Sequence, residues 1–223
     1  MGIKPVKTEI LGIRILPNAA PALLNRLRVR PGDCSLGIFT TDCDDVSYVA
    51  LDEATKKANV TVAYAGSMYA GSANASTALA GEFIGILSGP DPEEIHSGLE
   101  AAFCLIREEA CFYTANEAGS IVYFAHCISR SGTYLSAQAG AESGTSIAYL
   151  IAPPLEATAG LDAALKAANV AMGRYYGPPT ETNFSGGLLT GTESDCQAAC
   201  EAFAAVVCQI AGAPLEFSGR PAW

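Results

Sequence analysis

The amino-acid sequence repeats itself once. Residues 52–60 (DEATKKANV) return with changes as residues 162–170 (DAALKAANV), 110 positions later. A second pair follows, because residues 86–89 before one acidic stretch match residues 188–191 before another. This period, about half of the 223 residues, is too long for a solenoid, whose units have roughly 20–50 residues. The sequence therefore predicts two similar domains in tandem.

Strand and helix patterns follow the same order in both copies. In the first copy, β-rich segments at 35–40 and 46–51 flank a turn at 42–45, and a short helix is expected over 52–58. Strands over 60–65 and 82–88 come next. Antiparallel strands mixed with helices in this way predict an α+β protein with two α/β sandwiches, each sheet covered on one side by helices. We place the domains at residues 1–116 and 117–223.

Each copy ends in an amphipathic helix with its own start signal. Asp91 is a suitable N-cap and Pro92 a suitable first helical residue, and Thr192 with Asp195 predicts the matching start in the second copy. The expected apolar faces are Ile95, Leu99, Ala102, Phe103 and Ile106 in the first helix, and Cys196, Cys200, Phe203, Val207 and Ile210 in the second.

The composition is that of a folded, acidic protein. Half of the residues are hydrophobic, 16% are charged, and the mean hydropathy is +0.25, so we expect apolar surface to be buried between subunits. The net charge of −10 argues against nucleic acid as a partner and favours small cations. The sequence contains no run of about 18 uncharged apolar residues, so we expect no membrane span and a cytosolic protein.

The eight cysteines form no Cys-x-x-Cys pair, and several stand in apolar periodic runs. We interpret Cys104, Cys196, Cys200 and Cys208 as small buried hydrophobic residues. Cys196 and Cys200 have the i, i+4 spacing of metal ligands on a helix, but without a neighbouring His the pair is more typical of core packing. The sequence predicts no metal site.

Two further features suggest a ligand site. Residues 66–81 are rich in Gly, Ser, Asn and Ala, and a loop of this length in a compact domain is usually functional. Asp44 and Asp45 are the pair of polar residues that most clearly suggests ligand binding, although adjacent acids after a strand are often only a solvated turn. His126 lies in an apolar run and is more typical of a core or interface residue than of a base. Residues 129–132 (SRSG) have no nearby base and read as a turn.

Longer segments resemble one family. Residues 161–170 (LDAALKAANV) are similar to the signature helix of bacterial microcompartment shell domains, which tile as hexagonal sheets around enzyme cores. Further segments narrow the resemblance to the shell proteins of ethanolamine utilisation, and together they span nearly the whole chain. They are residues 35–37 (SLG), 44–46 (DDV), 52–56 (DEATK), 69–71 (YAG), 129–132 (SRSG), 148–158 (AYLIAPPLEAT) and 181–184 (ETNF).

The resemblance implies a tandem, circularly permuted shell protein with ferredoxin-like domains, which forms a homotrimer of pseudo-sixfold shape beside other shell proteins. It further implies a gated central pore, with residues 66–81 and 175–186 as the gate, and small pores within each subunit that bind and pass ethanolamine. The matching positions in this sequence are Asp44, Asp45, Glu82, Phe112, Thr182, Asn183 and Phe184. Because they come from both copies, we expect the site to lie between the two domains.

Two other classes of function remain open at this point. An enzyme would use Asp44, Asp45 and Glu82 as acid and base, but the sequence supplies no nucleophile, electrophile or cofactor loop, so no catalytic residue is assigned. A sensing module for a small molecule, ethanolamine or a corrinoid, is the second alternative, and no residue argues for a corrinoid specifically. We therefore expect a non-catalytic protein that has no resident cofactor and is located in the microcompartment shell.

Overall fold

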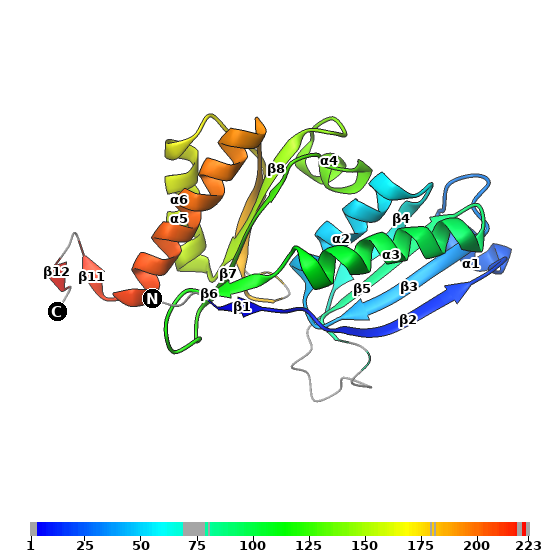
Figure 1. Ribbon diagram of the computed structural model, residues 1–223, viewed down its shortest axis with the longest axis horizontal. Coiled ribbons are helices and arrows are strands. Elements are labelled where there is room, and N and C mark those ends of the chain that lie inside the picture. The colour runs from blue at the N-terminus through cyan, green and yellow to red at the C-terminus, as the bar shows by residue number, and fades with distance from the viewer. Residues whose placement is uncertain are drawn as a thin grey trace.

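The computed structural model describes residues 4–68, 79, 81–178, 180, 182–217 and 220–221 (Figure 1). The first half of the molecule is a four-stranded sheet in the order β2-β3-β5-β4, and the second half is the larger part of a six-stranded sheet, β1-β6-β7-β8-β10-β9. The first-half elements are β2 (Ile10–Leu16), α1 (Pro21–Leu27), β3 (Ser35–Thr41), α2 (Asp44–Lys57), β4 (Thr61–Ser67), β5 (Phe83–Gly89) and α3 (Pro92–Glu108). The second-half elements are β7 (Val122–Ile128), α4 (Thr133–Ala139), β8 (Ser146–Ala152), α5 (Pro154–Ala167), β9 (Ala171–Tyr176), β10 (Ser185–Gly191) and α6 (Glu193–Gly212).

Two short pairs lie outside this repeat. β1 (Pro5–Val6) pairs with β6 (Phe112–Thr114) at the edge of the six-stranded sheet, and β11 (Glu216–Phe217) pairs with β12 (Arg220–Pro221). Helices α2 and α3 cover the first sheet, and α5 and α6 cover one face of the second (Figure 1). The α+β architecture expected from the sequence is therefore present, while the domain boundary after residue 116 stays a prediction.

The two halves match strand by strand. β3 pairs with β5 from Ser35 opposite Gly89 to Thr41 opposite Phe83, and β8 pairs with β10 over the same seven positions. Both edge strands also carry a bulge at the same place. Ala63 is the extra residue in β4 and Gly173 the extra residue in β9, 110 positions apart. The repeat seen in the sequence is thus a repeat of register as well as of elements.

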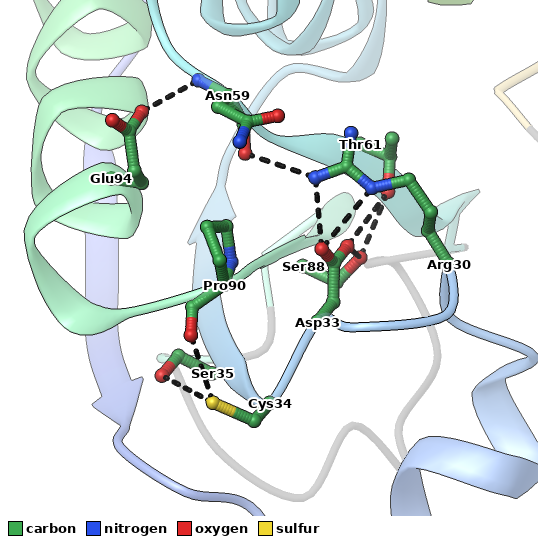
Figure 2. A network of polar contacts seen from close by, with 9 residues as sticks. All are labelled: Arg30, Asp33, Cys34, Ser35, Asn59, Thr61, Ser88, Pro90 and Glu94. Atoms are coloured by element: carbon green, nitrogen blue, oxygen red, sulfur yellow. Dashed lines mark hydrogen bonds and ion pairs between the residues drawn. The ribbon is translucent and has the colours of Figure 1, made fainter.

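The Asn-Val motif has the same structural role in both halves. After α2, the backbone N–H of Asn59 donates to the Glu94 carboxylate at 2.6 Å, as Figure 2 shows. After α5, the N–H of Asn169 donates to Asp195 at 3.3 Å. In each case an acid in the first turn of the next helix, α3 or α6, holds the turn that leads into the edge strand. The Asn-Val motif thus forms the same kind of junction in both copies.

A buried carboxylate close to the first of these junctions is fully paired. Asp33, whose side chain is 1% exposed, forms an ion pair with Arg30 at 2.8 Å and accepts a hydrogen bond from Ser88 Oγ at 2.7 Å (Figure 2). Thr61 Oγ1 donates to it at 3.4 Å. The network joins the start of β4 to the end of β5, and a buried charge with three partners is structural rather than available for a ligand.

The central strand β8 of the second sheet is buried on both faces. One face packs against α5 and α6, and the other joins the core of the first half through Phe124, Tyr149 and Ile151. All seven residues of β8 are consequently buried. One continuous apolar core therefore fixes the position of the two halves relative to each other, which matters for any site built from both.

Two expectations about the first half are wrong. Residues 46–51 do not form a strand, and residues 44–45 do not belong to a turn, because α2 runs from Asp44 to Lys57. The buried residues Val46, Val49, Ala50 and Ala54 recur at helical spacing, and that period outweighs the β-branched composition. Cys104 is exposed rather than buried, since it lies off the apolar face of α3, and Cys208 is half-buried. Cys196 and Cys200 are core residues as expected.

The expected helix starts are confirmed. Asp91 caps α3 by accepting from Glu94 N at 2.8 Å, and Thr192 caps α6 by accepting from Asp195 N at 3.2 Å. All five apolar positions predicted for α3 are buried. In α6 four of the five predicted positions are buried. Ile210 is only half-buried, because Ala211 is the buried residue in the last turn of that face.

Candidate functional site

The acidic pair stands at the start of α2, directly after β3. Asp44 and Asp45 form the first helical turn, where the positive end of the helix dipole favours carboxylates. Asp44 accepts hydrogen bonds from its neighbour's backbone, Asp45 N, at 2.9 Å and from Ser67 Oγ of β4 at 2.7 Å. Both aspartates are more than nine-tenths buried. They are therefore buried helical residues rather than part of a solvated turn.

Asp45 reaches across to the second half. The hydroxyl of Tyr149 in β8 donates to its Oδ1 at 2.6 Å, and Tyr149 is itself 2% exposed. Burial raises the pKa of Asp45 well above its usual range, and the adjacent charge of Asp44 raises it further. Burial likewise raises the pKa of Asp44. Neither aspartate forms an ion pair within the described residues. Two buried carboxylates side by side are costly as a pair of anions, which makes the position receptive to a positive charge.

Glu82 adds a third carboxylate just before β5. Its pKa is raised by burial, then by the charges of Asp44 and Asp42. Its backbone N–H donates to Thr41 O at 2.8 Å, which ties this residue to the end of β3 and so to the start of α2. Three carboxylates from separate positions in the sequence thus converge at one end of the first sheet.

An acidic cavity of about 170 Å³ opens beside these groups. It contains six of the seven residues predicted from the sequence, so the structure does bring them together. Its walls come from both halves of the molecule, as expected. The lining residues are Val6, Lys7, Thr8, Asp42, Cys43, Asp44, Asp45, Glu82, Phe112, Val122, Thr182 and Phe184.

The apolar wall of the acidic cavity is aromatic. Phe112 of β6 stacks on Phe124 with ring centroids 5.2 Å apart and meets Phe184 edge-on at 5.9 Å. The position of Phe184 is set by the turn before β10, where Thr180 Oγ1 donates to Phe184 O at 2.8 Å. Ring faces next to carboxylates suit an organic ammonium, because both attract positive charge.

A second cavity, of about 250 Å³, shares Asp44, Asp45, Thr182 and Phe184 with the acidic cavity. These four residues therefore stand between the two cavities. The second cavity is lined mainly by hydroxyl-bearing side chains and one cation, and we call it the tyrosine cavity. Its other lining residues include Tyr48, Ser67, Tyr134, Gln138, Tyr149, Arg174 and Tyr176.

Asn183 is the predicted residue that does not line the acidic cavity. It adopts a left-handed backbone with φ 62°, and its N–H donates to Thr180 O at 3.2 Å. Asparagine tolerates this conformation better than most residues, so its role is to form the turn that presents Thr182 and Phe184. Residues 69–78, 80, 179 and 181 of the predicted gate lie outside the described residues.

Sequence reasoning missed Tyr149 and Ser67, the partners of the acidic pair. Tyr149 lies in the segment 148–158, but an aromatic residue inside a buried strand carries no signal that its hydroxyl is used. Ser67 lies in the small-residue region 66–81, where nothing distinguished it from its neighbours. Only the fold places both hydroxyls on the aspartates.

The described residues contain no group of three or more His, Cys, Asp or Glu side chains arranged to hold a metal ion. None of the helices in the described ranges combines the length and hydropathy that crossing a bilayer requires. The chemistry available at the acidic cavity is recognition of a small cation with a polar end, through carboxylates, hydroxyls and aromatic rings.

Comparison with known proteins identifies the family that this chain resembles. Residues 35–116 match the model of the BMC domain. The bacterial microcompartment shell protein EutL of Clostridium perfringens is 55% identical over 212 residues, covering 95% of this chain and 98% of that protein. EutL of Escherichia coli is 44% identical over 95% of this chain and 96% of its own length. The crystal structure of EutL from Leptotrichia buccalis superposes with a TM-score of 0.94 at 57% identity, covering 97% of this chain and all of that chain.

Proposed function

The chain belongs to the EutL family of shell proteins of ethanolamine-utilisation microcompartments, and from that premise we propose that it is a non-catalytic, trimeric tile whose acidic cavity binds ethanolamine. The observation that carries the ligand proposal is the convergence of Asp44, Asp45 and Glu82 on one cavity beside two aromatic rings. The tile would assemble with its own copies and with other shell proteins.

The cavity matches ethanolamine at both ends of the molecule. The ammonium group would donate hydrogen bonds to the buried carboxylates. Such charge-assisted hydrogen bonds are roughly twice as strong as neutral ones. The hydroxyl end has Thr182 and the aspartate oxygens within the same lining. Asp44 and Asp45 line both the acidic cavity and the tyrosine cavity, so a guest held at the pair has space on both sides. A passage needs modest affinity, because a tightly bound guest would not leave.

The trimer proposal rests on an unmatched surface. Within the chain, α4 packs against α2, the two lying side by side in Figure 1. Its counterpart α1 has the same length of seven residues and the same left-handed C-cap, yet none of its residues is buried. α5, the counterpart of α2, shows exposed Leu165 and Leu155. A second copy whose α1 lies on this α5 would repeat the junction seen inside the chain.

Three chains would then supply six like domains around one axis, and closed cyclic symmetry is the usual solution for soluble oligomers. Sedimentation equilibrium should give a species near three times 23.0 kDa. A stable monomer at micromolar concentration would reject the trimer. The central pore and its gate, which involve residues outside the described ranges, are part of the proposed tile, and no resident cofactor is proposed.

Titration calorimetry tests the ligand. Ethanolamine should bind the wild-type protein, and Asp45→Asn should weaken binding by roughly 1–3 kcal/mol, the scale of a lost charge-assisted hydrogen bond. Glu201→Gln, which changes an exposed acid of α6 that does not line the cavity, is the charge-matched control and should bind as the wild type does. Equal affinity in the Asp45 variant would reject the site.

The same samples test the non-catalytic assignment. Ethanolamine kept with the wild-type protein should be recovered unchanged by proton NMR, because binding without selective stabilisation of a transition state lowers no barrier. Any protein-dependent product would reject this part of the proposal and favour the enzyme class.

The raised pKa values add a pH dependence. A bound cation favours the ionised carboxylates, so binding should release protons and tighten as the pH rises from 5 toward 8. Calorimetry in two buffers of different ionisation enthalpy would measure the released protons, and binding that weakens with rising pH would contradict the assigned carboxylates.

A further inference from the structure

A separate cavity lies on the other side of the junction between the halves, where the end of α2 meets the loop before α4. Its volume is about 420 Å³, and it shares no lining residue with the acidic or tyrosine cavity. We call it the basic cavity. It is lined by Glu53, Thr55, Lys56, Lys57, Arg130, Ser131, Gly132, Ser143 and Gly144.

The charge of this cavity is opposite to that of the whole chain. Lys56, Lys57 and Arg130 face one carboxylate, Glu53, so the lining carries two net positive charges in a protein of net charge −10. Glu53 pairs with Lys56 and lies 3.8 Å from Lys57. The guanidinium of Arg130 has no hydrogen-bond or ion-pair partner within the ranges that the structure describes.

An unused hydroxyl belongs to the same lining. Ser131 is 2% exposed, and among the described residues its Oγ is the only buried side-chain oxygen or nitrogen without a partner. Its backbone is fully engaged, since its N–H donates to Thr145 O at 3.0 Å and its carbonyl accepts from Gly144 N at 2.8 Å. A buried hydroxyl without a partner costs about 1–3 kcal/mol, and a ligand in the adjoining cavity would supply the partner that it lacks.

The loop that carries these groups is held firmly. Gly132 N donates to the buried carboxylate of Asp52 at 2.6 Å, and Lys56 Nζ donates to Arg130 O at 3.0 Å. A Cβ at Gly132 would lie 2.2 Å from Thr55 Oγ1, so only glycine permits this approach of loop and helix. The cavity is therefore preorganised by packing rather than formed by surface side chains alone.

We propose that the basic cavity binds the phosphate group of a small phosphomonoester. A phosphate dianion matches the two net positive charges, Arg130 offers a planar fork for two of its oxygens, and hydroxyls of serine are its usual neutral donors. A cavity of this volume exceeds a bare phosphate and leaves room for a small organic group. The site is independent of the ethanolamine proposal, because no residue is shared.

Calorimetry with inorganic phosphate and with glycerol phosphate, each against the full-length wild-type protein at low salt, tests the site. Both should bind, and tighter binding of glycerol phosphate would identify the organic ester as the source, whereas equal binding would identify free phosphate. Arg130→Ala should weaken both by about tenfold, the scale of one charge-assisted contact, and Arg130→Lys by less. Arg107→Ala, which removes an exposed guanidinium of α3 outside the cavity, is the matched control and should change nothing.

Ser131→Ala separates ligand binding from folding. It should weaken phosphate binding several-fold while the urea midpoint stays level or rises, because the variant removes a hydroxyl that the free protein leaves unpaired. Ethanolamine binding should be unchanged. Absence of phosphate binding in the wild type, or full binding in both Arg130→Ala and Ser131→Ala, would overturn the proposal. Loss of two-dimensional sheets in Arg130→Ala with phosphate binding intact would also overturn it, in favour of a neighbouring protein as the occupant.

Discussion

Asp52 in α2 and Asp162 in α5 occupy the same position of the repeat, yet their surroundings differ completely. Asp52 is fully buried, and its carboxylate accepts from Gly132 N at 2.6 Å and from Leu135 N at 2.8 Å, so it caps α4 of the other half. Asp162 is exposed and pairs with Lys166, its neighbour one turn along the helix. One motif thus serves as an internal clamp in the first copy and lies open in the second.

The difference shows that the repeated motif specifies the helix and the Asn-Val turn after it. The element that packs against the helix determines whether the aspartate is buried or exposed. In both copies the helix ends in Asn-Val and the next helix supplies the acid that holds the turn. Only the first copy has a helix docked on its aspartate. The open state of Asp162 is what a chain would show if its partner helix were α1 of another copy.

The largest expected effect comes from removing the clamp. Asp52→Ala leaves two buried backbone N–H groups without an acceptor, and we expect the free energy of unfolding in urea to fall by about 3 kcal/mol. Asp162→Ala should change it by less than about 0.5 kcal/mol when both proteins are compared as monomers, because exposed pairs contribute little. Equal losses in the two variants would break the contrast between the copies.

The next largest expected effect is a pH dependence of stability, and it arises at a position where the two halves carry different residues. His126 of β7 is half-buried and stacks on Phe124, whereas the matching residue of β2, Arg14, is exposed. Burial, followed by the charge of Lys56, lowers the pKa of His126 to about 4. The unfolded chain then binds more protons than the native one between pH 6.5 and 4, so this residue makes stability fall as the pH falls through that range.

We expect the wild-type protein to lose about 2 kcal/mol more than His126→Gln between pH 6.5 and 4, measured from urea midpoints. The aspartates near the acidic cavity act in the opposite direction, since their raised pKa values make acid stabilising, and the difference between the two proteins removes their contribution. Parallel pH profiles for the two proteins would show that His126 is not desolvated in solution.

A smaller effect tests the open aspartate. If α1 of another copy docks on α5, Asp162→Ala should raise the dissociation constant of the trimer by about tenfold while leaving the monomer folded. Leu165, 38% exposed on the same helix, offers a second variant, and Leu165→Asp should have the same sense of effect. Sedimentation equilibrium over a dilution series measures both, and Leu215→Asp, an exposed apolar residue beyond α6, is the control. An unchanged trimer in both α5 variants would place the interface elsewhere.

The smallest effect compares the two Asn-Val junctions. Glu94→Ala removes a 2.6 Å hydrogen bond donated by Asn59 N. Asp195→Ala removes a 3.3 Å bond donated by Asn169 N, together with an exposed bond donated by Thr192 Oγ1. We expect losses of about 1 and about 0.5 kcal/mol in the free energy of unfolding, because the shorter bond is better made. Each variant keeps the N-cap residue of its helix. The reverse order would show that the second junction, despite its longer bond, is the tighter one.

The sequence predicted much of this molecule because the repeat and the helix faces are periodic signals. The fold class, the caps at Asp91 and Thr192 and the face of α3 are all encoded locally. The start of α2 was missed because valines and an aromatic residue over 46–51 imitate a strand, and only packing against the first sheet decides for a helix. The local sequence pattern alone does not decide between a strand and a helix at these residues.

The candidate site was within reach only through the family resemblance. Asp44, Asp45, Glu82, Phe112, Thr182 and Phe184 are scattered over 140 positions of the sequence, and no spacing links them. The bond from Tyr149 to Asp45 joins residues 104 positions apart, so it follows from how the halves dock. The basic cavity was overlooked for the same reason, since residues 129–132 alone resemble a plain turn.

The short strand β1 has a consequence for the newly made chain. Pro5 and Val6 pair with Tyr113 and Phe112, so β1 leaves the ribosome long before its partner strand β6. At roughly 5–20 residues per second, it waits on the order of 5–20 seconds for its partner. During that time it is an unpaired strand beside other growing chains, and Pro5, which has no N–H to donate, limits the wrong pairings it can make. A residue that reads as an ordinary edge proline in the finished tile thus protects the tile while it is being made.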